Sequence, residues 1–195
     1  EELKKRAELA KEMGGIERVA KHYARGRLTV RERIDQLLDE DSFHETGEIT
    51  GKVSYDENGE IKEFVPANFV FGRGKLDGRE VVVAGDDFTV RGGAADARIG
   101  NKSLYSLKLA EHLRLPLVNL VDGSGGGGSV KTLETMGATY VPGLPSWQNI
   151  VRLLSMVPVV GACMGSVAGL GSARVVASHF SIMVKGSAQM FVAGP

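Results

Sequence analysis

The stretch LPLVNLVDGSGGGGS, residues 115–129, joins a short apolar run to a glycine-rich turn. An apolar run of this length that ends in turn residues is typical of a buried β-strand, and glycine allows backbone conformations that other residues avoid. The same pattern occurs twice more, in VVVAGDDFTVRGGA (81–94) and in VPVVGACMGSVAGLG (157–171). Segments with helical spacing lie between these stretches, so the sequence predicts an α/β core in which strands alternate with helices.

The core extends in both directions from these stretches. Helices are expected at 102–113, at 146–155 and from about Gly169, and strands at 115–121, 157–163, 181–184 and 190–192. Upstream, Asn58-Gly59 and Asp77-Gly78 are two-residue hairpin signals between alternating segments. Antiparallel strands should therefore dominate residues 47–90.

A helical arm is predicted ahead of this core. Apolar residues recur with helical spacing up to about Met13, where Gly14-Gly15 ends the helix. Thr29, with Glu32 three residues later, indicates the start of a second helix. The basic run from Lys21 to Arg33 is expected to be a solvated or inter-subunit face. We therefore divide the chain into an arm, residues 1–45, and a core domain, residues 46–195.

The composition excludes several classes of protein. The 195 residues carry 24 Lys+Arg and 24 Asp+Glu, so no overall basic field exists to attract nucleic acid. The 26 glycines follow no triplet period, which argues against a collagen-like chain. The uncharged segment 153–173 is interrupted by Pro158 and several glycines, so membrane insertion is not expected. The charged N-terminus and the single Cys163 favour a reducing compartment, the cytoplasm or the mitochondrial matrix of a eukaryote.

Three glycine-rich turns, 91–94, 124–128 and 165–171, follow strands and are expected to converge on one edge of the sheet, where ligands bind. Asp122 lies beside one turn, but no His or second carboxylate lies in these turns, so a nucleophilic triad is not supported. The four histidines lack metal-ligand spacing, and a P-loop is absent. The remaining chemistry is an oxyanion hole, in which backbone N–H groups stabilise negative charge on a carbonyl oxygen, as in a thioester enolate.

These same residues resemble the carboxyltransferase (beta) subunit of biotin-dependent acyl-CoA carboxylases of the propionyl- and methylcrotonyl-CoA type. The segment GGIERVAKHYARGRLTVRERIDQLLDEDSFHE (14–45) is similar to the N-terminal arm of that family, and VVVAGDDFTVRGGAADA (81–97) to its strand and first glycine turn. PLVNLVDGSGGG (116–127) and VPVVGACMGSVAGLGSA (157–173) resemble its further glycine turns. The resemblance covers essentially the whole chain. It implies the crotonase-like (ClpP/crotonase) fold, an α/β superhelix of ββα units, with an N-terminal helical arm.

The activity that the resemblance implies is the transfer of a carboxyl group from carboxybiotin to the α-carbon of an acyl-CoA. The family's pair of oxyanion-hole amides falls on Gly169 and Leu170, where the family has glycine in place of Leu170. Contacts to the acyl-CoA are implied for Arg91, Gly92, Gly93, Ala94, Lys102, Ser124, Gly125, Gly126, Gly127 and Gly171. After Ser-Gly-Gly the family usually continues with Ala-Arg, whereas this chain has Gly127-Gly128-Ser129.

The resemblance also implies biotin, carried by a partner protein, as the cofactor, with no metal in this subunit. A biotin carboxylase or biotin carrier subunit and further copies of the full-length subunit are the implied partners. The family continues into a second crotonase-like domain on the biotin side, so this chain is expected to bind CoA weakly and not to complete the transfer alone. Two alternatives stay open: a decarboxylase or transcarboxylase subunit that runs the same chemistry in reverse, and a non-catalytic assembly subunit of the same fold.

Overall fold

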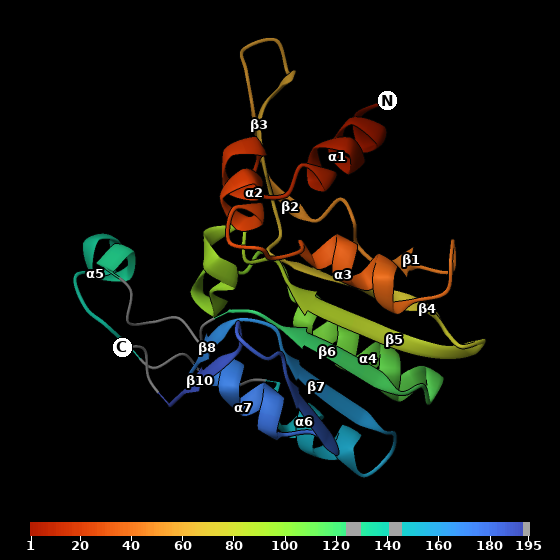
Figure 1. The fold of residues 1–195 in the computed structure, drawn as a ribbon. Coiled ribbons are helices and arrows are strands. Elements are labelled where there is room, and N and C mark those ends of the chain that lie inside the picture. The colour runs from red at the N-terminus through yellow and green to blue at the C-terminus, as the bar shows by residue number, and fades with distance from the viewer. Residues whose placement is uncertain (124–129, 141–145, 193–195) are drawn as a thin grey trace.

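A six-stranded sheet lies at the centre of the protein (Figure 1). The structure is a computed structural model that describes residues 1–123, 130–140 and 146–192. The strands are ordered β1 (His44–Glu45), β4 (Phe69–Leu76), β5 (Arg79–Asp86), β6 (Leu117–Val121), β7 (Val159–Cys163) and β9 (Phe180–Met183). The pairs from β1 to β5 are antiparallel and the pairs from β5 to β9 are parallel. The carboxyl ends of β5, β6 and β7 therefore meet at one edge of the sheet.

Both predicted hairpins are present. The β4–β5 hairpin turns at Asp77-Gly78, with φ of 50° and 76°, the pair of positive values that a type I′ turn requires. Strands β2 (Gly51–Tyr55) and β3 (Ile61–Pro66) form a second hairpin around Asn58-Gly59, and it projects from the body of the protein (Figure 1). A further small sheet pairs β8 (Ser166–Ala168) with β10 (Gln189–Phe191) in parallel.

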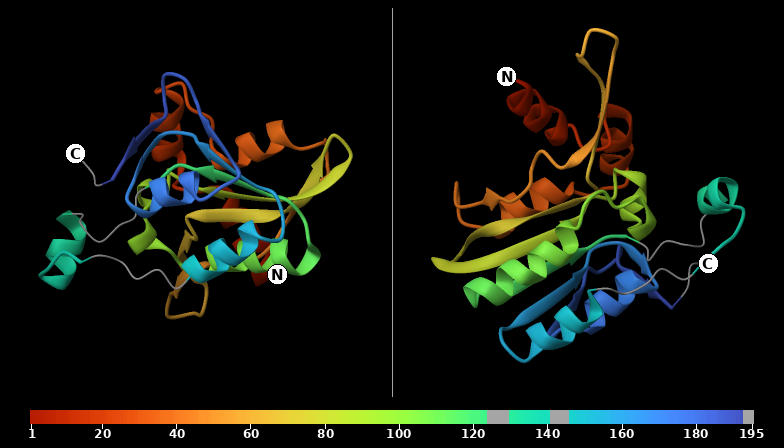
Figure 2. Two further views of the ribbon diagram at one scale, coloured as in Figure 1. Left: turned by 90° about the horizontal axis from the view of Figure 1, so that it is seen from below. Right: turned by 180° about the vertical axis from the view of Figure 1, so that it is seen from behind.

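Helices cover both faces of the central sheet, as the right-hand view of Figure 2 shows for α3 (Val30–Leu37) and α4 (Lys102–Leu113). On one face, Leu107 of α4 and Leu153 of α6 (Trp147–Leu154) pack in one cluster with Val82. On the other face, Ile34 of α3 packs in a second cluster with Val83. Successive strand residues point to opposite faces, so the apolar run of β5 serves both clusters.

The N-terminal arm contains α1 (Glu2–Lys11), α2 (Ile16–Tyr23) and α3. The predicted capping box starts α3: Thr29 Oγ1 accepts the N–H of Glu32, and Glu32 Oε2 accepts the N–H of Thr29 at 2.8 Å. Helix α2 was not predicted from the sequence. Because Val30 and Ile34 are buried against the sheet, the last helix of the arm belongs to the core, and the division at residue 45 stays a prediction.

The remaining elements surround the edge at which the parallel strands end. They are the 3-10 turns η1 (Arg91–Gly93) and η2 (Ala95–Ala97), α5 (Val130–Met136) and α7 (Leu170–Val176). Helix α4 has the predicted bounds, and β6, β7, β9 and β10 begin and end within two residues of the predicted ones. Across the described residues, none of the helices combines the length and the apolar character needed to cross a bilayer.

Candidate functional site at the carboxyl ends of the parallel strands

The glycine turns pack directly against one another at the carboxyl ends of the strands. A Cβ added to Gly93 would lie 2.4 Å from the carbonyl oxygen of Asp122, and one added to Gly123 would lie 2.4 Å from that of Gly93. A Cβ on Gly171 would lie 2.3 Å from the carbonyl oxygen of Gly123. These positions leave no room for a side chain. The expected convergence is thus confirmed for the first and third turns, while Ser124, Gly125, Gly126 and Gly127 lie outside the described residues.

The third turn ends at the start of α7. Gly169 precedes the helix with φ 58° and ψ −118°, and its N–H donates a hydrogen bond to the carbonyl oxygen of Phe191 at 3.1 Å. Leu170 and Gly171 follow in the first turn of the helix, where backbone N–H groups have no acceptor within the helix. Of the two predicted oxyanion-hole donors, Gly169 is therefore engaged with β10, whereas the N–H of Leu170 has no backbone acceptor among the described residues.

Three aspartates are buried beside this junction. Asp122, fully buried, accepts a hydrogen bond from Arg33 Nη1 at 2.7 Å through Oδ2, and its own N–H donates to Asp86 Oδ2 at 3.1 Å. Asp87 accepts both the N–H and the hydroxyl of Thr89, and burial raises the pKa of its carboxyl group. The sequence predicted no second carboxylate within the glycine turns, and Asp86 lies ahead of the first of them. The consecutive aspartates at the end of the strand 81–86 were the signal that could have revealed it.

Arg91 lies at the rim of a basic pocket of about 280 Å³. The pocket is also lined by Arg18, Lys21, Arg25 and Phe88. Its floor includes His22, which is buried, stacks on Phe88 and makes a hydrogen bond through Nε2 with the carbonyl oxygen of Leu28 at 3.0 Å. Burial lowers the pKa of His22, so its neutral form is favoured. Residues Lys21 and Arg25, from the basic run of the arm, thus lie next to the first glycine turn.

Lys102 is not available to a ligand in this structure. Its ammonium group is buried and lies 3.1 Å from Glu45 Oε1, while Arg31 binds the other oxygen of Glu45 at 2.6 Å. Burial lowers the pKa of Lys102, and the charge of Glu45 opposes that shift. In this structure Lys102 forms an internal ion pair that ties α4 to β1, and its implied contact with the acyl-CoA stays a prediction.

The residues described by the structure contain no group of three or more His, Cys, Asp or Glu side chains placed to hold a metal ion. Cys163 is buried, and burial raises the pKa of its thiol. The described site presents backbone amides at the start of α7 and exposed arginine and lysine side chains in the basic pocket.

The chain belongs to the carboxyl transferase domain family, whose model matches residues 21–195. It is 34% identical over 196 residues to the beta5 subunit of the biotin-dependent acetyl-/propionyl-coenzyme A carboxylase of Mycobacterium tuberculosis, covering 100% of this chain and 34% of the relative. It is 31% identical over 182 residues to the alpha subunit of the methylmalonyl-CoA decarboxylase of Veillonella parvula, covering 93% of this chain and 35% of the relative.

Among solved structures, transcarboxylase 12S matches all of this chain with a TM-score of 0.75 and 28% identity, and the match covers 37% of that protein. That structure is described as a hexamer with hydrolysed methylmalonyl-coenzyme A bound. The family and the crotonase-like α/β fold expected from the sequence are confirmed. The chain spans about a third of the length of the curated relatives it matches.

Proposed function

We propose that the protein containing this chain transfers a carboxyl group from carboxybiotin to the α-carbon of an acyl-CoA, and that residues 1–195 provide the acyl-CoA side of the site. The observation that supports this most directly is the packing of the glycine turns against the first turn of α7. This packing presents backbone amides of α7 beside the end of β6, in a chain that belongs to the carboxyl transferase family.

The proposed reaction needs an enolate at the thioester. When a proton leaves the α-carbon, negative charge develops on the thioester oxygen, and the N–H of Leu170 is the proposed donor to that oxygen. One such donor contributes about 2.7–4 kcal/mol to the stability of the transition state in a site that excludes water. Gly171 supports the donor, because any side chain there would collide with the backbone of Gly123 and push the start of α7 away.

The basic pocket is the proposed site for the phosphates of CoA. Arg91, Lys21 and Arg25 are exposed cations on one cavity, and Phe88 gives it an apolar wall. Since the net charge of the chain is zero, a local group of cations is what would attract a polyphosphate. A contribution of Ser124, Gly125, Gly126 and Gly127 to the acyl site rests on the family resemblance alone.

Biotin is proposed to arrive on a carrier protein, and the residues that contact it are proposed to belong to a second domain or a second subunit. Assembly of several copies is supported by the hexameric assembly of the transcarboxylase 12S core. A biotin carboxylase or carrier partner, and a location in the cytoplasm or the mitochondrial matrix, complete the proposal.

A decarboxylase is the second candidate, since 93% of this chain aligns at 31% identity with a methylmalonyl-CoA decarboxylase subunit. The same amide would stabilise the same enolate after loss of CO2 rather than before its gain. The direction then depends on the partner, and the chemistry assigned to Leu170 is unchanged. A non-catalytic assembly subunit would need none of this chemistry.

Leu170→Pro in the full-length protein tests the proposal. Leu170 is the first residue of α7, a position that tolerates proline, so the substitution removes the N–H while the helix can still form. With the biotin partner and labelled bicarbonate present, we expect the rate of label transfer to acyl-CoA to fall about 10²–10³-fold.

Leu170→Ala is the matched control, because it shortens the side chain and keeps the N–H, and it should stay within a few-fold of the parent rate. Equal rates for the proline and alanine variants would remove this amide from the mechanism. No label transfer by the parent protein to any acyl-CoA would favour the assembly subunit.

A further inference from the structure

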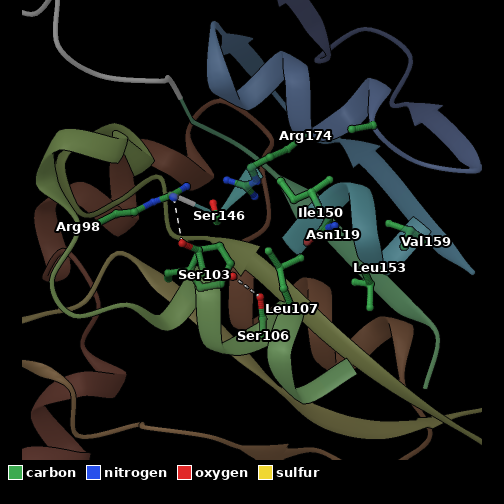
Figure 3. A pocket seen from close by; sticks show the side chains of 12 residues that line it. Arg98, Ser103, Ser106, Leu107, Asn119, Ser146, Ile150, Leu153, Val159 and Arg174 are labelled. Carbon is green, nitrogen blue, oxygen red and sulfur yellow. Dashed lines mark hydrogen bonds between the residues drawn. The ribbon is translucent and has the colours of Figure 1, made fainter. Parts of the chain in front are cut away.

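A small pocket lies between α4, α6 and α7, and Phe69, Asn119 and Val159 from β4, β6 and β7 also line it. Figure 3 shows Arg98 and Arg174 extending toward each other at one end of it, with Ser146 close to both. Leu107 and Leu153 line another part of the wall. The cavity volume is about 30 Å³, and an enclosed water needs about 10–15 Å³. The pocket therefore has room for a group of two or three non-hydrogen atoms.

Among the side chains that the structure describes, the charges at this end of the pocket do not balance. Arg174 Nη1 lies 2.9 Å and Arg98 Nη2 lies 3.6 Å from the same oxygen of Asp86, which is almost completely buried. The second oxygen of Asp86 already accepts the N–H of Asp122, whose own carboxylate is paired with Arg33. Two guanidinium groups thus share a single described carboxylate, and within this described set one positive charge is left over.

Both guanidinium groups are held in place, and one has an unused donor. Each lies 5.6 Å from the centre of the Phe69 ring. Arg98 Nη1 donates to Ser103 Oγ at 3.0 Å, whereas Arg174 Nη2 is buried without a hydrogen-bond partner among the described residues. Burial, and next the charge of Arg174, lowers the pKa of Arg98 to about 10. An anion in the pocket would satisfy both the free donor and the excess charge.

The position of the pocket indicates which part of an acyl-CoA would reach it. Arg174 follows Leu170 by four residues on α7, so the two lie on one side of the helix, about 6 Å apart along its axis. A group that extends a few carbons from a thioester at Leu170 would arrive at Arg174. The CoA phosphates leave the thioester in the opposite direction along the cofactor, and the exposed basic pocket on α2 suits them better.

We propose that Arg98 and Arg174 bind a carboxylate at the far end of the acyl group, so that the preferred substrates are CoA monothioesters of dicarboxylic acids. A carboxylate has three non-hydrogen atoms, which matches the volume, and its planar pair of oxygens suits the planar guanidinium groups. The inference rests on the proposed function, because the thioester is placed at Leu170.

Equilibrium binding to the full-length protein tests the inference without any carboxyl transfer. Titration calorimetry with glutaryl-CoA and pentanoyl-CoA compares acyl groups of equal length with and without the terminal carboxylate. We expect glutaryl-CoA to bind at least 10-fold more tightly, since a hydrogen bond to a charged group contributes about 1.5–3 kcal/mol, or roughly 10- to 150-fold. Succinyl-CoA and adipyl-CoA, against butyryl-CoA and hexanoyl-CoA, locate the best chain length.

Arg98→Met should remove most of the preference for glutaryl-CoA and leave the affinity for pentanoyl-CoA within a few-fold. Asp86 keeps its nearer partner, Arg174, in this variant, so the fold is expected to persist. Arg98→Lys, which retains the charge, should keep part of the preference, and Arg79→Met, an exposed arginine at the start of β5, should keep all of it.

Equal affinities of the parent protein for the two thioesters, or a preference unchanged in Arg98→Met, would overturn the inference. Efficient carboxylation of pentanoyl-CoA without any glutaryl preference would overturn it while supporting the proposed function. A glutaryl preference that depends on Arg98, without any carboxyl transfer, would support the inference and contradict the proposed function.

Discussion

The ion pair of Arg33 and Asp122 links the arm to the candidate site, and its removal should be costly. The two side chains are 6% and 0% exposed, and Arg33 Nη1 lies 2.7 Å from Asp122 Oδ2. The other carboxylate oxygen, Oδ1, is buried without a hydrogen-bond partner among the described residues. Arg33 is therefore the main group that compensates this charge. Arg33→Met fills a similar volume and leaves the carboxylate buried without that compensation.

Arg33→Met is expected to lower the free energy of unfolding by about 3–5 kcal/mol, the usual cost of removing one partner of a buried ion pair. Against a total stability of about 5–15 kcal/mol, this is a large fraction. Urea unfolding followed by circular dichroism measures it. With an m-value of about 2 kcal/mol/M, the midpoint should fall by roughly 2 M.

A second variant isolates the charge from the packing. Arg33→Met combined with Asp122→Asn has no charge at either position, so it should be more stable than Arg33→Met alone by more than about 1 kcal/mol. A loss below about 1 kcal/mol for Arg33→Met, which is typical of an exposed surface pair, would refute the claim that Asp122 depends on Arg33.

Two further predictions concern the basic pocket. Arg25→Gln combined with Arg91→Gln should raise the KM for acyl-CoA roughly 5- to 30-fold, because two exposed charges together contribute about 1–2 kcal/mol to the binding free energy. The effect should be smaller at high salt, which screens exposed charges. Steady-state kinetics with Arg79→Gln as the control checks this, and an equal KM for both variants would contradict it. The lowered pKa of His22 means that the folded state disfavours its charged form. The neutral imidazole of His22 therefore contributes its full stabilisation of the folded state above pH 6.5, the ordinary pKa of histidine. This stabilisation is lost as the pH falls from 6.5 toward the lowered pKa of His22 in the folded protein. His22→Phe removes this titration, so its urea midpoint should fall less than that of the parent between about pH 7.5 and pH 5.5. Equal falls would show that His22 does not titrate differently on folding.

The sequence was sufficient where local chemistry determines the structure. Thr29 and Glu32 are three residues apart and cap α3 as predicted, and the Asp77-Gly78 pair sets its own turn. Helix α4 begins and ends as predicted. Helix α2 was missed because its eight residues between Gly15 and Ala24 also fit a solvated basic segment.

The charged contacts of the site could not be predicted in this way. Arg33 and Asp122 are 89 residues apart, and Arg174 and Asp86 are 88 residues apart. No spacing rule connects such pairs, since they meet only after β5, β6 and α7 have been assembled at one edge. The same holds for Lys102, whose partner Glu45 is 57 residues away on β1. A lysine on a helix has no local feature that distinguishes an internal pair from a surface position.

The glycines at the junction and the buried ion pairs beside it have a common cause. Gly93, Gly123 and Gly171 let the first turn, the end of the β6 segment and the start of α7 approach backbone to backbone, which leaves no space for a side chain at these three positions. The carboxylates that end β5 and β6 must then be compensated by arginines from elsewhere, and α3 and α7 provide them. The glycines that looked like ligand contacts in the sequence thus divide by role. Gly93 and Gly171 are pressed against neighbouring backbone and have no room for a side chain, whereas the amide of Leu170 is the proposed donor to the thioester oxygen.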